Sequence, residues 1–168
     1  MNRSPSFKML VLLALAAGLF VLMTIDYLPE VVATHFGTDN RPNGWMTRGG
    51  YLLFTLAFGA GVSALVIFFV GVLPRIKPQW TNIPHRDYWL TPERREESLR
   101  FLAAHACWLA CLMVLLIAGI HALILLAHQS QPPLLPMVPF LGLLGGFLTG
   151  LAVWTVKIYR RFPRRAPR

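Results

Sequence analysis

The chain has 168 residues, of which 55% are hydrophobic and only 14% are charged. A soluble domain usually carries about a quarter charged residues, so this composition excludes an ordinary soluble protein. In a soluble protein the formal net charge of +9 would indicate nucleic-acid binding. Here most cations flank apolar runs, which favours contact with anionic lipid, and we expect no nucleic-acid partner.

Four apolar runs are each long enough to cross the hydrocarbon core of a bilayer, which takes roughly 20 helical residues. They cover residues 9–27, 51–73, 101–127 and 134–156, and Pro74 ends the second. The first run also resembles a signal peptide, but its small-residue cleavage pattern falls inside the run, so we expect an uncleaved span. The sequence therefore predicts an all-α membrane protein with four transmembrane helices.

The cations are divided unequally between the connections. Fourteen of the sixteen Lys and Arg residues lie in the N-terminal tail, in residues 74–100 or in the C-terminal tail, and the other two are Arg41 and Arg48. Four crossings place the three basic segments on one side. The positive-inside rule then predicts that both termini are cytoplasmic, with a structured outward loop over residues 28–50.

The runs divide the chain into four parts: residues 1–73, 74–100, 101–156 and 157–168. Residues 1–73 hold two spans and the outward loop, residues 101–156 a helical hairpin, and residues 157–168 a basic cytoplasmic tail. In residues 74–100 we expect a cytoplasmic interfacial helix, with Thr91 as its cap and Pro92 in its first turn. Its mixed charges indicate a solvated, self-paired surface, and a docking surface is the alternative.

Small residues predict how the spans pack. Gly142, Gly146 and Gly150 recur every four residues, and Gly59 with Ser63 offers a similar ridge in the second span. These ridges predict close packing of the second span against the fourth. The sequence leaves open whether the contact lies within one chain or between two copies in a homo-oligomer.

Three histidines are candidate ligands on the outward side. His121 and His128 share a helix stripe, and with His35 and a loop carboxylate they form a candidate site for a divalent metal. The seven-residue interval separates the two helical rings by about 10 Å, which is too far to bind one ion directly. The alternative is that His121 hydrogen-bonds across helices and that His128 lies at the interface, with no cofactor. We predict no catalytic residues, because no Ser/His/Asp or Cys/His set falls on one side.

The outward loop resembles the signature of a bacterial membrane family known as domain of unknown function 1648. The signature consists of Leu-Pro, a Thr-His-Phe triplet, a turn and Asn-Gly-Trp. Its positions here are Leu28, Pro29, Thr34, His35, Phe36, Pro42, Asn43, Gly44 and Trp45, with Asp39 in the turn. The family is distantly related to immunity proteins for a sporulation-delay toxin. Those proteins carry further spans, so we transfer only the position of the signature loop.

We therefore expect a non-enzymatic accessory, sensor or immunity-type protein. Its outward loop would contact an envelope peptide or a partner membrane protein, while the bilayer surrounds the spans. No span carries Asp, Glu, Lys or Arg near its middle, which disfavours an ion-coupled pump. A small transporter or transporter subunit is the alternative, and a metal-dependent membrane enzyme is the third hypothesis.

Overall fold

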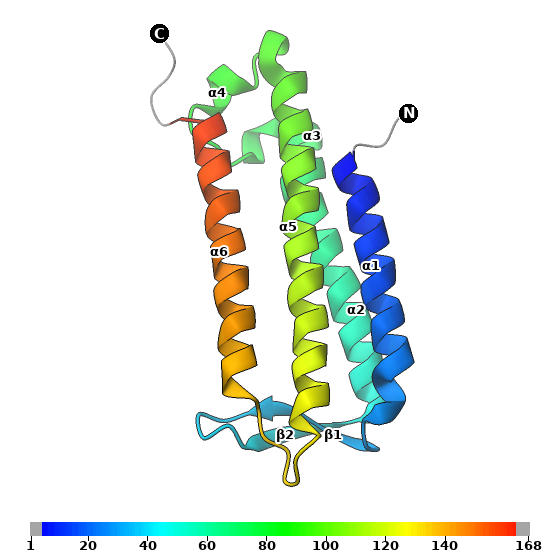
Figure 1. Ribbon diagram of the computed structural model, residues 1–168. Coiled ribbons are helices and arrows are strands. Elements are labelled where there is room, and N and C mark those ends of the chain that lie inside the picture. The colour runs from blue at the N-terminus through cyan, green and yellow to red at the C-terminus, as the bar shows by residue number, and fades with distance from the viewer. Residues whose placement is uncertain (1–4, 164–168) are drawn as a thin grey trace.

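The computed structural model describes residues 5–163, which contain four helices long enough to cross a membrane. Figure 1 shows these helices as a bundle with a small hairpin across one end. The start of α1 and the end of α6 lie at the opposite end of the bundle. The elements are α1 (Pro5–Thr24), η1 (Ile25–Tyr27), β1 (Val31–Phe36), β2 (Pro42–Thr47), α2 (Arg48–Val66), η2 (Ile67–Val72), α3 (Leu73–Ile76), η3 (Pro78–Trp80), α4 (Arg86–Trp89), α5 (Pro92–Ala127) and α6 (Met137–Arg161).

The four predicted spans are confirmed as helices long and apolar enough to cross a membrane, with bounds Pro5–Tyr27, Arg48–Ile76, Pro92–Ala127 and Met137–Arg161. The second does not end before Pro74 as expected. Pro74, which has no N–H to donate, follows the π-helical turn η2, and the helix continues through α3. Most large side chains of the spans are exposed, as expected of a lipid-facing surface.

Helix α5 is the centre of the bundle. It packs against α1, α2 and α6, and Figure 1 shows it between α6 on one side and α1 with α2 on the other. The buried residues Cys107, Ala110, Cys111 and Val114 of α5 form an apolar cluster with Leu10 of α1. Since α5 separates α2 from α6, the predicted packing of the second span on the fourth is wrong within one chain.

The outward loop is a two-stranded antiparallel sheet rather than an irregular loop, so the all-α prediction fails for this segment. The sequence VVATHF in β1 contains the β-branched residues that suit a half-buried strand. Val32 and Ala33 are fully buried, because the hairpin lies across the ends of the helices. The spans are therefore helical, whereas the loop between the first two is a β-hairpin.

The predicted interfacial helix is not separate from the third span. Helix α5 begins at Pro92 and runs for 36 residues, about 54 Å at 1.5 Å per residue, which exceeds the ~30 Å hydrocarbon core. No proline or glycine interrupts it between Pro92 and Gly119, so the helical hydrogen bonding continues across the boundary. Thr91 occupies the cap position, but its hydroxyl donates to the carbonyl of Tyr88 and accepts from the guanidinium of Arg94, rather than from a backbone N–H of the helix.

Candidate functional site

The turn of the hairpin is formed by polar residues of the loop between the first two spans. The Asp39 carboxylate accepts from the backbone N–H of Arg41 at 3.2 Å, and Asn40 adopts a positive φ of 63°. The N–H of Gly37 donates to the carbonyl of Arg41 at 2.8 Å, which closes the turn. Pro42, which cannot donate, begins β2, where a missing N–H is tolerated. The turn chemistry of the sequence thus reverses the chain compactly.

His35 lies on the exposed surface of β1 and is held by the opposite strand. Its Nδ1–H donates to the side-chain oxygen of Asn43. Gly44 is the register partner of His35, and a Cβ at position 44 would lie 3.0 Å from the Cβ of His35. The signature residues His35, Asn43 and Gly44 are therefore one cross-strand unit, in which glycine allows the close approach.

The two aromatic signature residues have different environments. Phe36 is half-buried and packs against the apolar cluster that includes Ile25, Leu28 and Ile124. Trp45 is 55% exposed and lies opposite Ala33 in the register. Phe36 therefore anchors the hairpin, and Trp45 extends from it as an amphipathic side chain suited to the membrane surface.

His128 attaches the hairpin to the end of α5. Its Nδ1–H donates to the carbonyl of Ile124 at 2.8 Å, so its Nε2 is an acceptor and receives the N–H of Ala33 at 3.1 Å. The N–H of Leu135 also donates to the carbonyl of Asn40 at 3.1 Å. The hairpin is thus held at its strand by the His128 side chain and at its turn by a backbone bond from Leu135.

The base of the hairpin is fixed to α1 and α2. The N–H of Arg48 donates to the carbonyl of Glu30 at 2.8 Å, and its guanidinium donates to the carbonyl of Leu28 and lies 3.6 Å from Asp26. The hydroxyl of Thr47 accepts from the N–H of Gly50 and caps α2. The hairpin is therefore continuous with the membrane helices on either side.

His121 lies beneath the hairpin, fully buried at the meeting point of α1, α2 and α5. The Thr24 hydroxyl donates to the carbonyl of Phe20 at 2.6 Å, so it accepts from His121 Nε2–H at 2.8 Å. The Tyr51 hydroxyl donates to Nδ1 at 2.8 Å, and the Tyr51 ring stacks on the imidazole. This is the cross-helix hydrogen bonding stated as the alternative to metal binding, and it satisfies both nitrogens of a neutral ring.

The structure does not bring the three histidines together as metal ligands. His121 and His128 each use both ring nitrogens in hydrogen bonds, while His35 lies on the exposed hairpin with Asn43. Within residues 5–163, no group of three or more His, Cys, Asp or Glu side chains is arranged to hold a metal ion. The carboxylate of Asp26, a nearby candidate, pairs with Arg48.

The glycine ridge of α6 packs closely against α5 at Gly150 but not at its other end. A Cβ at Gly150 would lie 2.8 Å from Leu112 of α5, whereas Gly142 and Gly146 face open space. In α2, Gly59 packs against Ile117 of α5. The predicted ridges thus contact α5 rather than each other.

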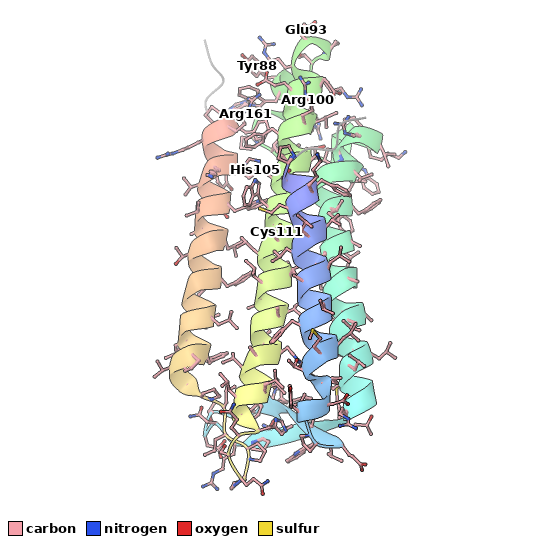
Figure 2. The ribbon with its side chains drawn as sticks, turned by 45° about the vertical axis from the view of Figure 1, so that its right-hand side comes forward. Tyr88, Glu93, Arg100, His105, Cys111 and Arg161 are labelled. Atoms are coloured by element: carbon pink, nitrogen blue, oxygen red, sulfur yellow. The ribbon has the colours of Figure 1, made fainter. Side chains whose placement is uncertain are left out.

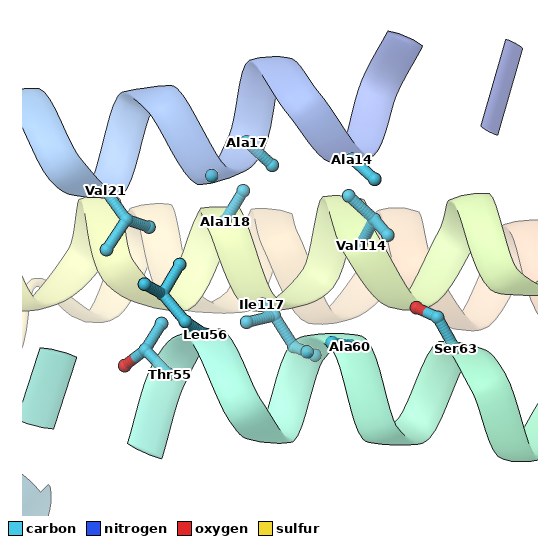
Figure 3. A pocket seen from close by; sticks show the side chains of 12 residues that line it. Ala14, Ala17, Val21, Thr55, Leu56, Ala60, Ser63, Val114, Ile117 and Ala118 are labelled. Carbon is cyan, nitrogen blue, oxygen red and sulfur yellow. The ribbon is translucent and has the colours of Figure 1, made fainter. Parts of the chain in front are cut away.

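Ser63 lies with Gly59 in a cavity of ≈ 240 Å³ bounded by α1, α2 and α5 (Figure 3). The cavity is lined by small and aliphatic residues, and among the described residues that line it Thr55 and Ser63 carry the only hydroxyls. The side-chain oxygen of Ser63 has no hydrogen-bond partner among the described residues. The small residues of α2 therefore border space between the helices instead of an α2–α6 contact.

A recess of ≈ 280 Å³ lies between the hairpin and the helices beneath it. The hairpin contributes Thr34, His35 and Met46, and the other lining residues are Tyr51, Phe54, Thr55, Phe58, Ile117, Ile120 and Ile124. The stacked rings of Phe54 and Phe58 are each half exposed. The recess is therefore apolar within and has the His35–Asn43 pair beside it. Its volume is below the ~300–1,000 Å³ of small-molecule sites and suits one large side chain.

Sequence reasoning missed Thr24 and Tyr51 as partners of His121. An imidazole inside a span needs a hydrogen-bond partner, and Thr24 and Tyr51 are polar residues at the ends of the first two spans that adjoin the hairpin. The signal available in the sequence was that Thr24 and Tyr51 lie at a similar depth to His121 along their spans. The sequence could not identify Tyr51 as a partner, because it does not show that the Tyr51 ring faces into the bundle, where it is 4% exposed, instead of the membrane surface.

The sequence of the hairpin and of parts of its two flanking helices matches a known family. Residues 11–59 match the family described as domain of unknown function (DUF1648). The match confirms the resemblance over the first helix, the hairpin and the first half of the second helix. No curated protein and no solved structure matches the chain.

Proposed function

We propose that the chain is a non-enzymatic receptor-like protein of a bacterial inner membrane, whose hairpin binds a hydrophobic side chain of an envelope peptide or partner membrane protein. The observation that carries the proposal is the recess beneath the hairpin, lined by Phe54, Phe58 and Met46. An apolar side chain would enter the recess, and a polar group beside it would meet His35. Such a combination of an apolar pocket and one polar contact gives both affinity and orientation.

The proposal places the hairpin outside the cytoplasm. The connection between α2 and α5, the start of α1 and the end of α6 share the end opposite the hairpin. These segments with their tails carry fourteen of the sixteen Lys and Arg residues. The positive-inside rule supports a cytoplasmic position for that end.

The hairpin suits binding because it is rigid. His128 and the membrane helices hold its strand, turn and base, so a ligand does not have to order it. Preorganisation of this kind lowers the entropy cost of binding. An immunity-type role, in which the recess holds a toxic envelope peptide, is one form of this function.

The transporter alternative gains no support from His121. Both of its ring nitrogens are bonded within the bundle, and the bonds to Thr24 and Tyr51 account for its presence in a span. A substrate would have to break these bonds to use the imidazole. We therefore propose binding at the hairpin rather than transport through the bundle.

Photocrosslinking in cells tests the proposal. A benzoyl-phenylalanine at position 58 is expected to form an adduct with a peptide or membrane protein, and His35→Ala should reduce the yield at least severalfold without lowering membrane levels. The matched control is position 69, where Phe69 is exposed on the same helix outside the recess. Lipid adducts alone, or the same adducts from both positions, would refute the proposal.

A further inference from the structure

A second hollow lies at the other end of the bundle, between α5 and α6. Its volume is ≈ 510 Å³, and it is lined by Phe101, His105, Trp108, Leu112, Gly150, Val153, Trp154, Lys157 and Arg160. On each helix these residues recur at intervals of three and four, so they form two facing stripes. Figure 2 shows His105 and Arg161 at this level of the bundle.

Two aromatic side chains set the depth of this hollow in the membrane. Trp108 is half exposed, and the indole N–H of Trp154 donates to the carbonyl of His105 at 2.8 Å. Tryptophan is enriched at the boundary between headgroups and hydrocarbon. The hollow therefore lies where a phospholipid changes from a polar headgroup to an acyl chain.

The polar end of the hollow carries two cations without an anionic partner. The side chains of Lys157 and Arg160 are exposed and make no hydrogen bond or ion pair with residues 5–163. The neighbouring Arg161 differs, because it donates to Glu97 at 2.9 Å and lies over the ring of Trp89. The two free cations thus face the headgroup region with their charge uncompensated.

Below the tryptophans the same pair of helices leaves room for an acyl chain. A further hollow of ≈ 250 Å³ shares Leu112 with the first and is lined by leucines, Phe147, Gly142 and Gly146. Nothing lies within 4 Å of a Cβ built at Gly142 or Gly146. From Lys157 to Gly146 the helix rises about 16 Å, which is close to half of the ~30 Å hydrocarbon core.

We propose that these hollows are a binding site for one anionic phospholipid. Its phosphate contacts Lys157 and Arg160, its glycerol region lies beside Trp108 and Trp154, and an acyl chain follows α6 toward Gly146. Charge complementarity selects the anionic lipid, since a zwitterionic headgroup brings a cation of its own toward Lys157 and Arg160. Basic pockets between transmembrane helices bind acidic lipid headgroups by this chemistry.

Native mass spectrometry of the purified full chain tests the site, with phosphatidylglycerol and phosphatidylcholine of identical acyl chains as probes. We expect the wild type to prefer phosphatidylglycerol. The double variant Lys157→Gln, Arg160→Gln should lose up to about thirtyfold of that preference, because each cation contributes about 1 kcal/mol and a tenfold change in affinity corresponds to about 1.4 kcal/mol. The matched control is Lys77→Gln with Arg100→Gln, which removes two exposed cations outside the hollow. An equal loss in both double variants would overturn the site.

Two further arms separate this site from other anion binding. Val153→Trp fills the hollow without changing charge and is expected to weaken binding of phosphatidylglycerol severalfold, and undiminished binding would contradict the site. Glycerol phosphate, which has the phosphate without acyl chains, is expected not to compete. Full competition by glycerol phosphate would show a free-phosphate site and overturn the proposal.

Discussion

The bonds of His121 make the sharpest prediction about what holds the bundle together. Tyr51→Phe removes the only donor to Nδ1 that residues 5–163 supply, on a ring that is fully buried. A buried acceptor left unpaired costs about 1–3 kcal/mol, while cross-helix hydrogen bonds in membranes average about 0.6 and reach about 1.7 kcal/mol. Because neither water nor lipid reaches this nitrogen, we expect Tyr51→Phe to lower the free energy of unfolding by about 1–2 kcal/mol.

A double-mutant cycle separates the hydrogen bond from packing. His121→Leu alone leaves the Tyr51 hydroxyl buried without its acceptor, whereas combining it with Tyr51→Phe removes both polar groups. The Thr24 hydroxyl still donates to the carbonyl of Phe20. The side chain of Thr55, which hydrogen-bonds with Tyr51, loses the same partner in Tyr51→Phe alone and in the double variant, so its effect cancels in the cycle. We expect its cost to be smaller than the sum of the single costs by about 1 kcal/mol.

The assay is steric trapping or detergent-induced unfolding of the full chain in lipid vesicles. Tyr27→Phe is the control, because Tyr27 lies at the same end of the bundle but is 80% exposed, and no change in stability is expected. If Tyr51→Phe behaves like Tyr27→Phe, or if the costs in the cycle simply add, the reasoning about the His121 network is wrong.

Three further predictions concern the attachment of the hairpin and the packing of the helices. His128→Ala leaves the backbone N–H of Ala33 in β1 without its acceptor and should raise the rate of amide exchange across the hairpin about tenfold or more. Hydrogen-exchange mass spectrometry measures this rate, and an unchanged rate would show that His128 does not hold the hairpin. Gly119→Ala, whose Cβ would lie 2.5 Å from a terminal methyl of Leu143, should lower the free energy of unfolding by about 1 kcal/mol relative to Gly146→Ala, because the Leu143 side chain must leave its rotamer, whereas a Cβ at Gly146 meets open space. Equal stabilities of the two variants would contradict this. Phe162→Ala removes a fully buried ring and should lower the free energy of unfolding by about 3 kcal/mol. Because this ring contacts Trp89, the variant should also be cleaved faster by protease in the connection between α3 and α5. Unchanged resistance of the connection would show that Phe162 does not hold it in place.

The sequence by itself determined the four spans and the similarity of residues 11–59 to DUF1648. Hydrophobic length is a one-dimensional property, so it locates a span without knowledge of the neighbouring helices. An even number of spans also places the two ends of the chain together. The turn of the hairpin followed from local chemistry at Asp39 and Pro42.

Only the tertiary structure decided which side chains meet. The ridges at Gly59 and Gly146 could not reveal their partners, because small residues permit close approach without specifying the helix that approaches. The strands of the hairpin depended on burial against the ends of the helices, which sequence periodicity did not show. His121 and His128 share a stripe on α5, yet one joins three helices and the other holds β1, since their hydrogen-bond partners come from segments distant in the chain.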